Sequence, residues 1–445
     1  MRKYQPLPVT TFLFTALLAI LTAAPLIAQA AAASALATQL NGILGLMASS
    51  TGNVVHVTGR ADVTSTLSLN IDPGVTVDWS ADVNGGTASG RYLINLSGGG
   101  TFNLNNATIN NKSGIITVTG EGASVNINGT LATPSDGNGI SLNVAANNVS
   151  LDIGAGGTII NSGTNSAINV TAGVTGVIVT VNGGEVVSEP SGYAINDGGT
   201  SLCANNTRLI MTSGEVRAGS ACAIKSTGEG STLTIIGGKV SNAATVNSNP
   251  VIYMNGGVGD NVSIGGSAVI IASNNNLGYG IQTTGNVTVG GNATVSATAG
   301  RAINLVGMDS VATINSGTVS ATTGVAICTA TTTPATVANT TIIVNGGTVC
   351  TTDPNAAHGV GKTIYGTGEN TNIIINGGHV YTLSGNTEAI YNAGARSNIT
   401  VNGGLVTGKD HFTIEATSGG YITVNGGFVF SYGTTVTSTN TSSNV

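Results

Sequence analysis

The sequence is poor in charged and in aromatic residues. Charged residues make up 7% of the 445 positions and aromatic residues 4%, whereas 41% are hydrophobic and 66 are glycine. An ordinary soluble domain carries about 25% charged residues. This composition argues against a conventional globular domain and favours a repeat array. Regularly spaced Val and Ile exclude a disordered glycine-rich chain.

Clusters of basic residues are also missing, which argues against nucleic acid as a partner. The basic Arg2 and Lys3 precede an apolar run, and Ala28–Ala30 is typical of a signal-peptidase site. We therefore expect residues 1–30 to be a signal peptide, with a retained N-terminal anchor as the alternative. Cleavage leaves 11 basic against 19 acidic residues, a net charge of −8, and no later membrane span follows. The predicted location is extracellular or at the cell surface.

Cysteine is scarce as well, and no Cys-x-x-Cys phrase indicates zinc. The four cysteines are Cys203, Cys222, Cys328 and Cys350. The first two and the last two are each separated by close to one repeat, which would stack them about 4.8 Å apart in neighbouring coils. Disulfides and free buried thiols are both consistent with this spacing in an exported chain.

One phrase recurs through the second half of the chain. It reads apolar-x-apolar-Asn-Gly-Gly-x-Val, and clean copies run over 179–186, 342–349, 373–380, 399–406 and 422–429. The second glycine of each copy, or its equivalent, returns every 23 to 31 residues, at Gly184, Gly214, Gly238, Gly266, Gly291, Gly317, Gly347, Gly378, Gly404 and Gly427. This period is too short for a propeller blade and suits one solenoid coil. Asn and Gly tolerate the left-handed backbone that a sharp corner needs.

A second phrase, small-x-Ile, lies between the copies of the first. Its isoleucines are Ile168, Ile195, Ile224, Ile252, Ile281, Ile303, Ile327, Ile364, Ile390 and Ile414, with weaker upstream candidates at Ile140, Ile116 and Ile94. Stacked parallel strands would place these side chains on one another inside the coil. The fold class is therefore all-β, a single-stranded right-handed parallel β-helix of about 13 coils.

The two ends of the stack differ in the sequence. Leu36, Leu40, Ile43, Leu44 and Met47 have helical spacing, so we expect residues 31–50 to form a capping helix. The β-solenoid should span residues 51–435, followed by a Thr/Ser/Asn-rich tail over 436–445. At the C-terminal end, Leu405, Phe428 and Phe430 occupy outward positions. Self-association or a further chain at that end is one expectation.

The Asn-Gly-Gly-punctuated array resembles the pectate-lyase-like superfamily of right-handed β-helices over about residues 50–435. It is most similar to the secreted, adhesin-like members that are not enzymes. The phrases Asn-Thr-Asp, Asp-Asp, Gly-His-Gly and Arg-Ile-Lys of the superfamily's enzymes are missing from the sequence, and Ala357 precedes His358-Gly359. The resemblance therefore implies a scaffold, and no catalytic residue is carried over.

The residue after the second glycine of each corner predicts a surface ladder: Glu185, Glu215, Lys239, Ser267, Asn292, Thr318, Thr348, His379, Leu405 and Phe428. Glu185 and Glu215 would lie about 5 Å apart, near the separation in a retaining glycosidase. They are the only catalytic candidates. The competing interpretation is a solvated ladder in which Arg217 and Lys239 neutralise the glutamates.

Three tyrosines each follow a predicted buried isoleucine and should point outward: Tyr253, Tyr365 and Tyr391. Exposed stacked rings can form a platform for a sugar, and simple stacking that stabilises the sheet is the alternative. Four consecutive corner asparagines, Asn345, Asn376, Asn402 and Asn425, should form an amide ladder. No carboxylate cluster suggests calcium, so we expect no metal and no cofactor.

These observations support three hypotheses. The first is a secreted or cell-surface structural or adhesive protein that presents a long polar face to a glycan, a matrix or a cell. The second is a polysaccharide lyase or glycoside hydrolase. The third is a passenger or fragment of a larger surface assembly. The missing catalytic phrases favour a function other than catalysis.

Overall fold

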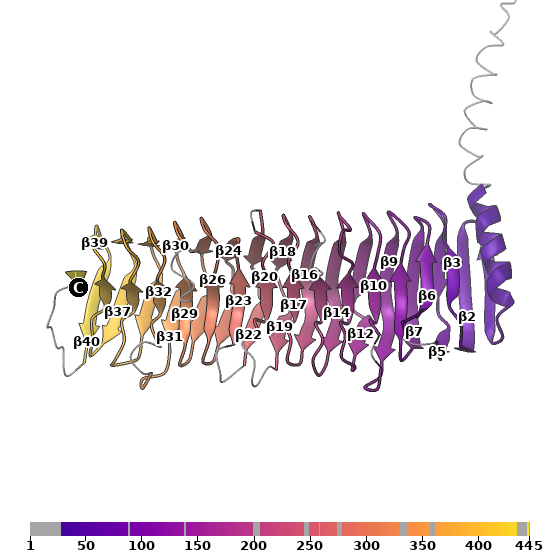
Figure 1. Cartoon of the computed structure of the whole chain (residues 1–445), viewed down its shortest axis with the longest axis horizontal. Helices are drawn as coiled ribbons and strands as arrows, with labels where there is room; N and C mark the ends of the chain where they lie inside the picture. Colours follow the sequence, from indigo (N-terminus) through magenta and orange to yellow (C-terminus); the bar gives the residue numbers. More distant parts are fainter. Residues whose placement is uncertain are drawn as a thin grey trace, which may run out of the picture.

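The computed structural model describes residues 28–87, 90–137, 139–198, 205–243, 249–257, 259–273, 278–329, 337–356, 361–433 and 443–444. The chain is a right-handed parallel β-solenoid of about 13 turns. Figure 1 shows the coils side by side along one axis, with a helix across the N-terminal end. Most of the predicted signal peptide lies outside the described residues.

Each coil contributes to two sheets. The smaller sheet has 15 strands. They are β3 (Leu67–Asn70), β6 (Tyr92–Ser97), β8 (Gly114–Val118), β10 (Leu142–Val144), β13 (Ile168–Val170), β15 (Ile195–Asp197), β17 (Ile224–Ser226), β20 (Ile252–Met254), β23 (Tyr279–Thr283), β26 (Arg301–Leu305), β29 (Val325–Thr329), β32 (Ile364–Gly366), β35 (Ile390–Asn392), β38 (Ile414–Ala416) and β41 (Ser443–Asn444).

The larger sheet has 26 strands, because most coils give it two strands joined at a corner. They are β1 (Leu46–Thr51), β2 (Val54–Val63), β4 (Thr76–Trp79), β5 (Asp82–Gly85), β7 (Thr101–Asn110), β9 (Ser124–Thr133), β11 (Ser150–Gly154), β12 (Thr158–Asn161), β14 (Ile178–Ser188), β16 (Arg208–Ala218), β18 (Thr232–Ile235), β19 (Lys239–Asn242), β21 (Asn261–Ile264), β22 (Val269–Ala272), β24 (Asn286–Val289), β25 (Thr294–Ala297), β27 (Val311–Ile314), β28 (Thr318–Ala321), β30 (Thr341–Val344), β31 (Thr348–Thr351), β33 (Asn372–Ile375), β34 (His379–Thr382), β36 (Asn398–Val401), β37 (Leu405–Lys409), β39 (Tyr421–Val424) and β40 (Phe428–Tyr432).

Parallel pairing joins each coil to the next, and only β1–β2 and β38–β41 pair antiparallel among the described strands. The predicted isoleucine column is confirmed from Ile168 to Ile414, with every member opposite the next. One upstream member was wrong. Leu142, and not Ile140, lies between Ile116 and Ile168, because β10 begins two residues later than the phrase suggested. These side chains belong to one continuous buried core.

The corners behave as the Asn-Gly-Gly phrase predicts. Gly378, for example, has φ +76°, and a Cβ built on it would lie 2.6 Å from the carbonyl oxygen of Gly347 in the coil below. The asparagine ladder is also confirmed. Asn376 donates to Asn345 at 2.8 Å and accepts from Asn402 at 2.9 Å, and the same pattern reaches Asn315 and Asn425.

The predicted N-terminal helix is confirmed, but its bounds differ from those expected. It covers residues 28–41, and Leu36 and Leu40 pack into the core. Gly45 has φ +92°, which favours glycine and ends any continuation. Leu44 lies in the turn before β1 and is 95% exposed, and Met47, in the strand that pairs with β2, is 64% exposed. Their helical spacing was coincidental.

The last described coil leaves aromatic side chains uncovered, as the sequence predicted. Phe428 is 74% exposed and Phe430 49% exposed, and Tyr421 beside them is 71% exposed. β41 pairs with β38 in the smaller sheet, while β39 and β40 pair, among the described strands, with β36 and β37 alone. The rest of the predicted tail lies outside the described residues.

Candidate functional site

The candidate glutamates and the candidate tyrosines lie on different sheets. Glu185 and Glu215 belong to β14 and β16 of the larger sheet, whereas the three tyrosines belong to β20, β32 and β35 of the smaller one. The candidate residues therefore lie on two separate surfaces, which cannot act as one site.

The glutamate surface is a ladder of ion pairs. Glu185 lies opposite Glu215, and Glu215 lies opposite Lys239, as predicted. Lys239 Nζ is 3.2 Å from Glu215 Oε1, and Arg217 Nε is 3.9 Å from the same oxygen. Arg217 also pairs with Glu189. These side chains are about one third to one half exposed, so the pairs add little stability.

Two members of the predicted surface ladder were wrong. Val269 and Thr294 continue the ladder, whereas Ser267 and Asn292 lie two residues earlier, in exposed turns. In these two coils the corner is longer, because Ala268 and Ala293 turn into the core before the strand begins. The looser Gly-Gly phrase without asparagine was the signal for this difference.

The outer face of the smaller sheet is built from two columns of side chains. The first follows each isoleucine of the core column by one residue. Its early members are an amide ladder, in which Asn169 donates to Asn143 and Asn196 donates to Asn169, both at 2.8 Å. Lys225, Tyr253 and Gln282 continue it in successive coils.

The second column precedes each isoleucine by two residues and was not predicted from the sequence. It contains Tyr92, Tyr193 and Tyr279, followed by Arg301. Lys225 Nζ lies 4.8 Å from the ring centroid of Tyr193, and the guanidinium carbon of Arg301 lies 5.4 Å from that of Tyr279. The same two-residue offset from the isoleucine would have identified these rings.

We call these residues together the tyrosine face: Tyr92, Tyr193, Lys225, Tyr253, Tyr279, Gln282, Tyr365 and Tyr391. The six tyrosine rings of this face are half-buried. Burial raises the pKa of Tyr92, Tyr253 and Tyr365, so their hydroxyl groups remain protonated donors at neutral pH.

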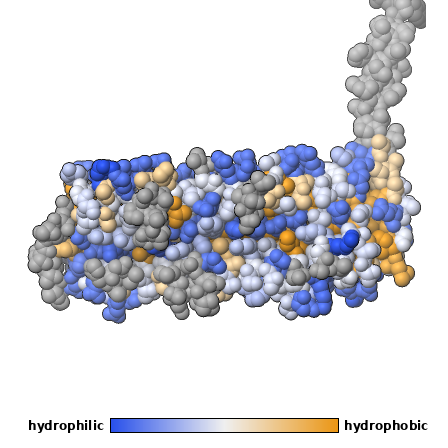
Figure 2. Space-filling model, viewed as in Figure 1, coloured by the Kyte–Doolittle hydropathy of each residue, from blue (hydrophilic) through white to orange (hydrophobic). Residues whose placement is uncertain are grey.

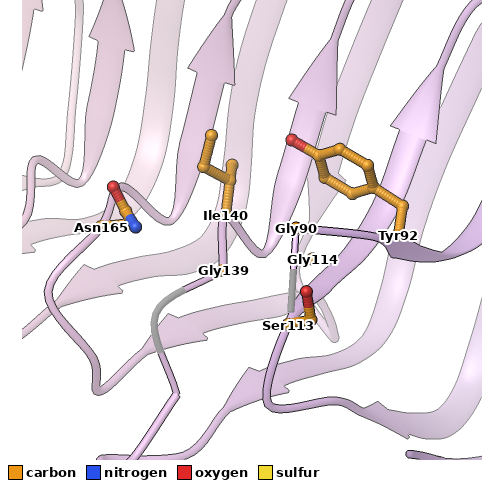
Figure 3. Close-up of a pocket in the computed structure, with 7 residues that line it drawn as sticks. All are labelled: Gly90, Tyr92, Ser113, Gly114, Gly139, Ile140 and Asn165. Carbon is orange, nitrogen blue, oxygen red and sulfur yellow. The ribbon is translucent and has the colours of Figure 1, made fainter. Parts of the chain in front are cut away.

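Two shallow cavities open on the tyrosine face. One of about 290 Å³ lies between the columns and is lined by Tyr193, Cys222, Lys225, Asn249, Pro250, Tyr253, Tyr279 and Gln282. The other, of about 310 Å³, surrounds Tyr92. Figure 3 shows its ring extending toward Ile140, with Asn165 across the pocket. Gly114 leaves room for this ring, since a Cβ there would lie 2.2 Å from it.

Tyr365 and Tyr391 are neighbours in register, as predicted, with ring centroids 5.4 Å apart. Lys362 Nζ lies 5.3 Å and 4.8 Å from the two ring centroids. The pair is thus held on one side by a buried cation. Tyr253 is separated from this pair by Gln282, Asn304 and Cys328 of the same column.

The predicted stacking of Cys328 on Cys350 is wrong. Cys328 belongs to β29 of the smaller sheet and Cys350 to β31 of the larger one, because 22 residues fall short of this coil's full length. Both are buried free thiols, as is Cys222. Burial raises the pKa of Cys328 to about 11 and that of Cys222 to about 12, so both remain protonated. Cys203 lies outside the described residues.

Two buried carboxyl groups of one corner were also not singled out as sites. Asp197 is completely buried and Asp260 is 1% exposed, and burial raises the pKa of each to about 6. Asp260 borders a third cavity of about 450 Å³. No group of three or more His, Cys, Asp or Glu side chains suited to a metal occurs among the described residues.

Figure 2 shows hydrophilic and neutral residues over most of the visible solenoid, with hydrophobic residues concentrated at the helical end. Within the described part of the chain, no helix is long and apolar enough to span a membrane. No protein-family model, no curated protein and no solved structure matches the chain.

Proposed function

We propose that this chain is a secreted or cell-surface adhesive protein that binds glycan, matrix or a cell surface through the tyrosine face. The carrying observation is the pair of adjacent columns on the smaller sheet, where aromatic rings, amides and a lysine surround a cavity of about 290 Å³. Sugars bind to such surfaces by stacking on rings and by hydrogen bonding to amides and hydroxyl groups.

The shape of the face supports an extended ligand. Its columns run along the coil axis, so a polymer lying on it would contact aromatic and polar side chains from several successive coils. The cavities are shallow, which suits binding along a chain better than enclosure of a small molecule. We place the protein, on this proposal, among the adhesin-like members of the pectate-lyase-like superfamily.

The glutamate ladder gives less support to catalysis. Neither Glu185 nor Glu215 lines any of the three cavities described above. Glu215 is engaged by Lys239 and Arg217. A glycosidase needs one carboxylic acid to protonate the leaving group and a site that holds the sugar ring beside both groups.

The experiment is retention of residues 31–445 on immobilised polysaccharides, extracellular matrix and fixed cells. We expect retention on at least one surface, and about a two- to tenfold loss of affinity in Tyr253→Ala, because a stacked ring contributes roughly 0.5–1.5 kcal/mol. Tyr421→Ala is the matched control, since Tyr421 is 71% exposed on the larger sheet. Equal losses in the two variants, or no retention on any surface, would contradict the proposal.

A further inference from the structure

A cluster of charged side chains joins three successive coils beside Tyr365 and Tyr391, and its lysine and glutamate occupy buried positions of the second column. Lys362 precedes β32 and Glu388 precedes β35, and since Ile364 lies opposite Ile390, the two charged residues stack in neighbouring coils. Lys362 is 3% exposed and Glu388 1% exposed. His411, from the next coil, completes the cluster.

The charged groups of the cluster lie close together, but their contacts are longer than good hydrogen bonds. Lys362 Nζ is 3.5 Å from Glu388 Oε2, and His411 Nδ1 is 3.5 Å from Glu388 Oε1. Oε2 has no hydrogen-bond partner among the described residues. The rings of Tyr365 and Tyr391 cover the amine.

A buried ion pair is stabilising only when short hydrogen bonds compensate for the lost hydration of both charges. Charge-assisted N–H···O bonds measure about 2.7–2.9 Å. Because the contact is 3.5 Å long and one carboxylate oxygen has no hydrogen bond, the attraction between the two charges compensates poorly for their lost hydration. Condensation of the two groups to an amide would remove both charges.

We propose that Lys362 and Glu388 form an intramolecular isopeptide bond. The step begins with transfer of one proton from Nζ to Oε2 across the 3.5 Å contact. The neutral amine then attacks Cδ of the carboxylic acid, forming the Nζ–Cδ bond. A second proton passes from nitrogen to Oε2, the Cδ–Oε2 bond breaks, and Oε2 leaves as water. Both protons of that water come from the original ammonium group, so atoms and charge balance without a further reactant.

The surrounding residues suit this step. His411 faces the oxygen that stays, where an Nδ1–H donor stabilises the negative charge that develops on Oε1. The backbone holds amine and carboxyl side by side, which replaces a bimolecular encounter with a positioned contact. The His411 side chain is 24% exposed, so the released water has a route to solvent. The product is a covalent staple between neighbouring coils.

The test is a tryptic map of the purified, denatured protein together with its intact mass. Between Arg301 and Arg396 the only tryptic site is Lys362. A cross-linked lysine resists trypsin, so the proposal predicts a single peptide 302–396 that is lighter by one water. Lys239 is the internal control, because it contacts Glu215 at 3.2 Å but is about half exposed, and it should be cleaved normally.

Variants distinguish a covalent link at Lys362 from slow tryptic cleavage at that residue. Lys362→Arg should restore the full mass and cleavage after residue 362. Neither Glu388→Gln nor Glu388→Ala should form the link, because neither side chain can accept the ammonium proton in the first step. His411→Phe should lower the cross-linked fraction. Recovery of peptides 302–362 and 363–396 from the unmodified protein, with an unchanged intact mass, would overturn the proposal and leave a buried ion pair only.

Discussion

Replacing Asp197 by Asn should stabilise the protein at neutral pH and leave its stability at acidic pH unchanged. Asp197 is completely buried, and its Oδ2 accepts from Ser226 Oγ at 2.7 Å and from Ser231 Oγ at 3.4 Å. Burial raises its pKa from 3.8 to about 6 despite these hydroxyl groups, and the neighbouring Asp260 raises it further. The ionised form therefore destabilises the folded state.

The direction in which the free energy of unfolding changes with pH follows from proton binding. Between about pH 4 and pH 6 the folded state holds a proton at Asp197 that the unfolded state has lost, so the free energy of unfolding falls as pH rises through this window. A shift of about two units corresponds to roughly 3 kcal/mol. Asp197→Asn removes this loss, and its amide oxygen still accepts from Ser226. We expect a gain of roughly 2–3 kcal/mol at pH 8 and almost none at pH 4.

The assay is urea denaturation at pH 4 and pH 8, followed by circular dichroism. Glu185→Gln is the control, because it makes the same change in charge at a half-exposed position on the larger sheet. An equal effect of Asp197→Asn at both pH values would refute the reasoning, as would a loss of stability at pH 8.

The remaining predictions concern the corners and the open end. Asn376→Ala breaks two ladder hydrogen bonds and should lower the free energy of unfolding by about 1 kcal/mol, measured by urea denaturation. Gly378→Ala should cost more than 1 kcal/mol, because the position has φ +76° and a Cβ would meet backbone, whereas Gly290→Ala, with open space around it, should cost much less. Phe428→Ser with Phe430→Ser should weaken any concentration-dependent self-association seen by light scattering, because these rings are a large part of the exposed apolar surface of the last described coil.

The repeat was predictable because its physics is local. A buried isoleucine in each coil and a glycine at each corner determine the register, and the structure confirms both from Ile168 to Ile414. The predicted register was wrong where that local signal was weak. Ile140 was chosen over Leu142, and Ser267 over Val269, because a longer or looser turn shifts the strand by two residues.

The composition of the tyrosine face was only partly predictable. Tyr253, Tyr365 and Tyr391 follow an isoleucine and were identified from that position. Tyr193 and Tyr279 lie across the cavity from Tyr253. Each precedes its isoleucine by two residues, and in a regular strand this offset would place them on the same face as the buried isoleucine. The buried cluster at Lys362 was also hidden, since Glu388 and His411 come from later coils.

The most direct test of the central claim, that the protein binds polysaccharide without cleaving it, is to count new sugar ends. Purified residues 31–445 would be incubated with each polysaccharide that retains them, with and without calcium, beside a heat-denatured control. We expect no new sugar ends above that control. Release above it would contradict the claim and direct attention to Glu185 and Glu215.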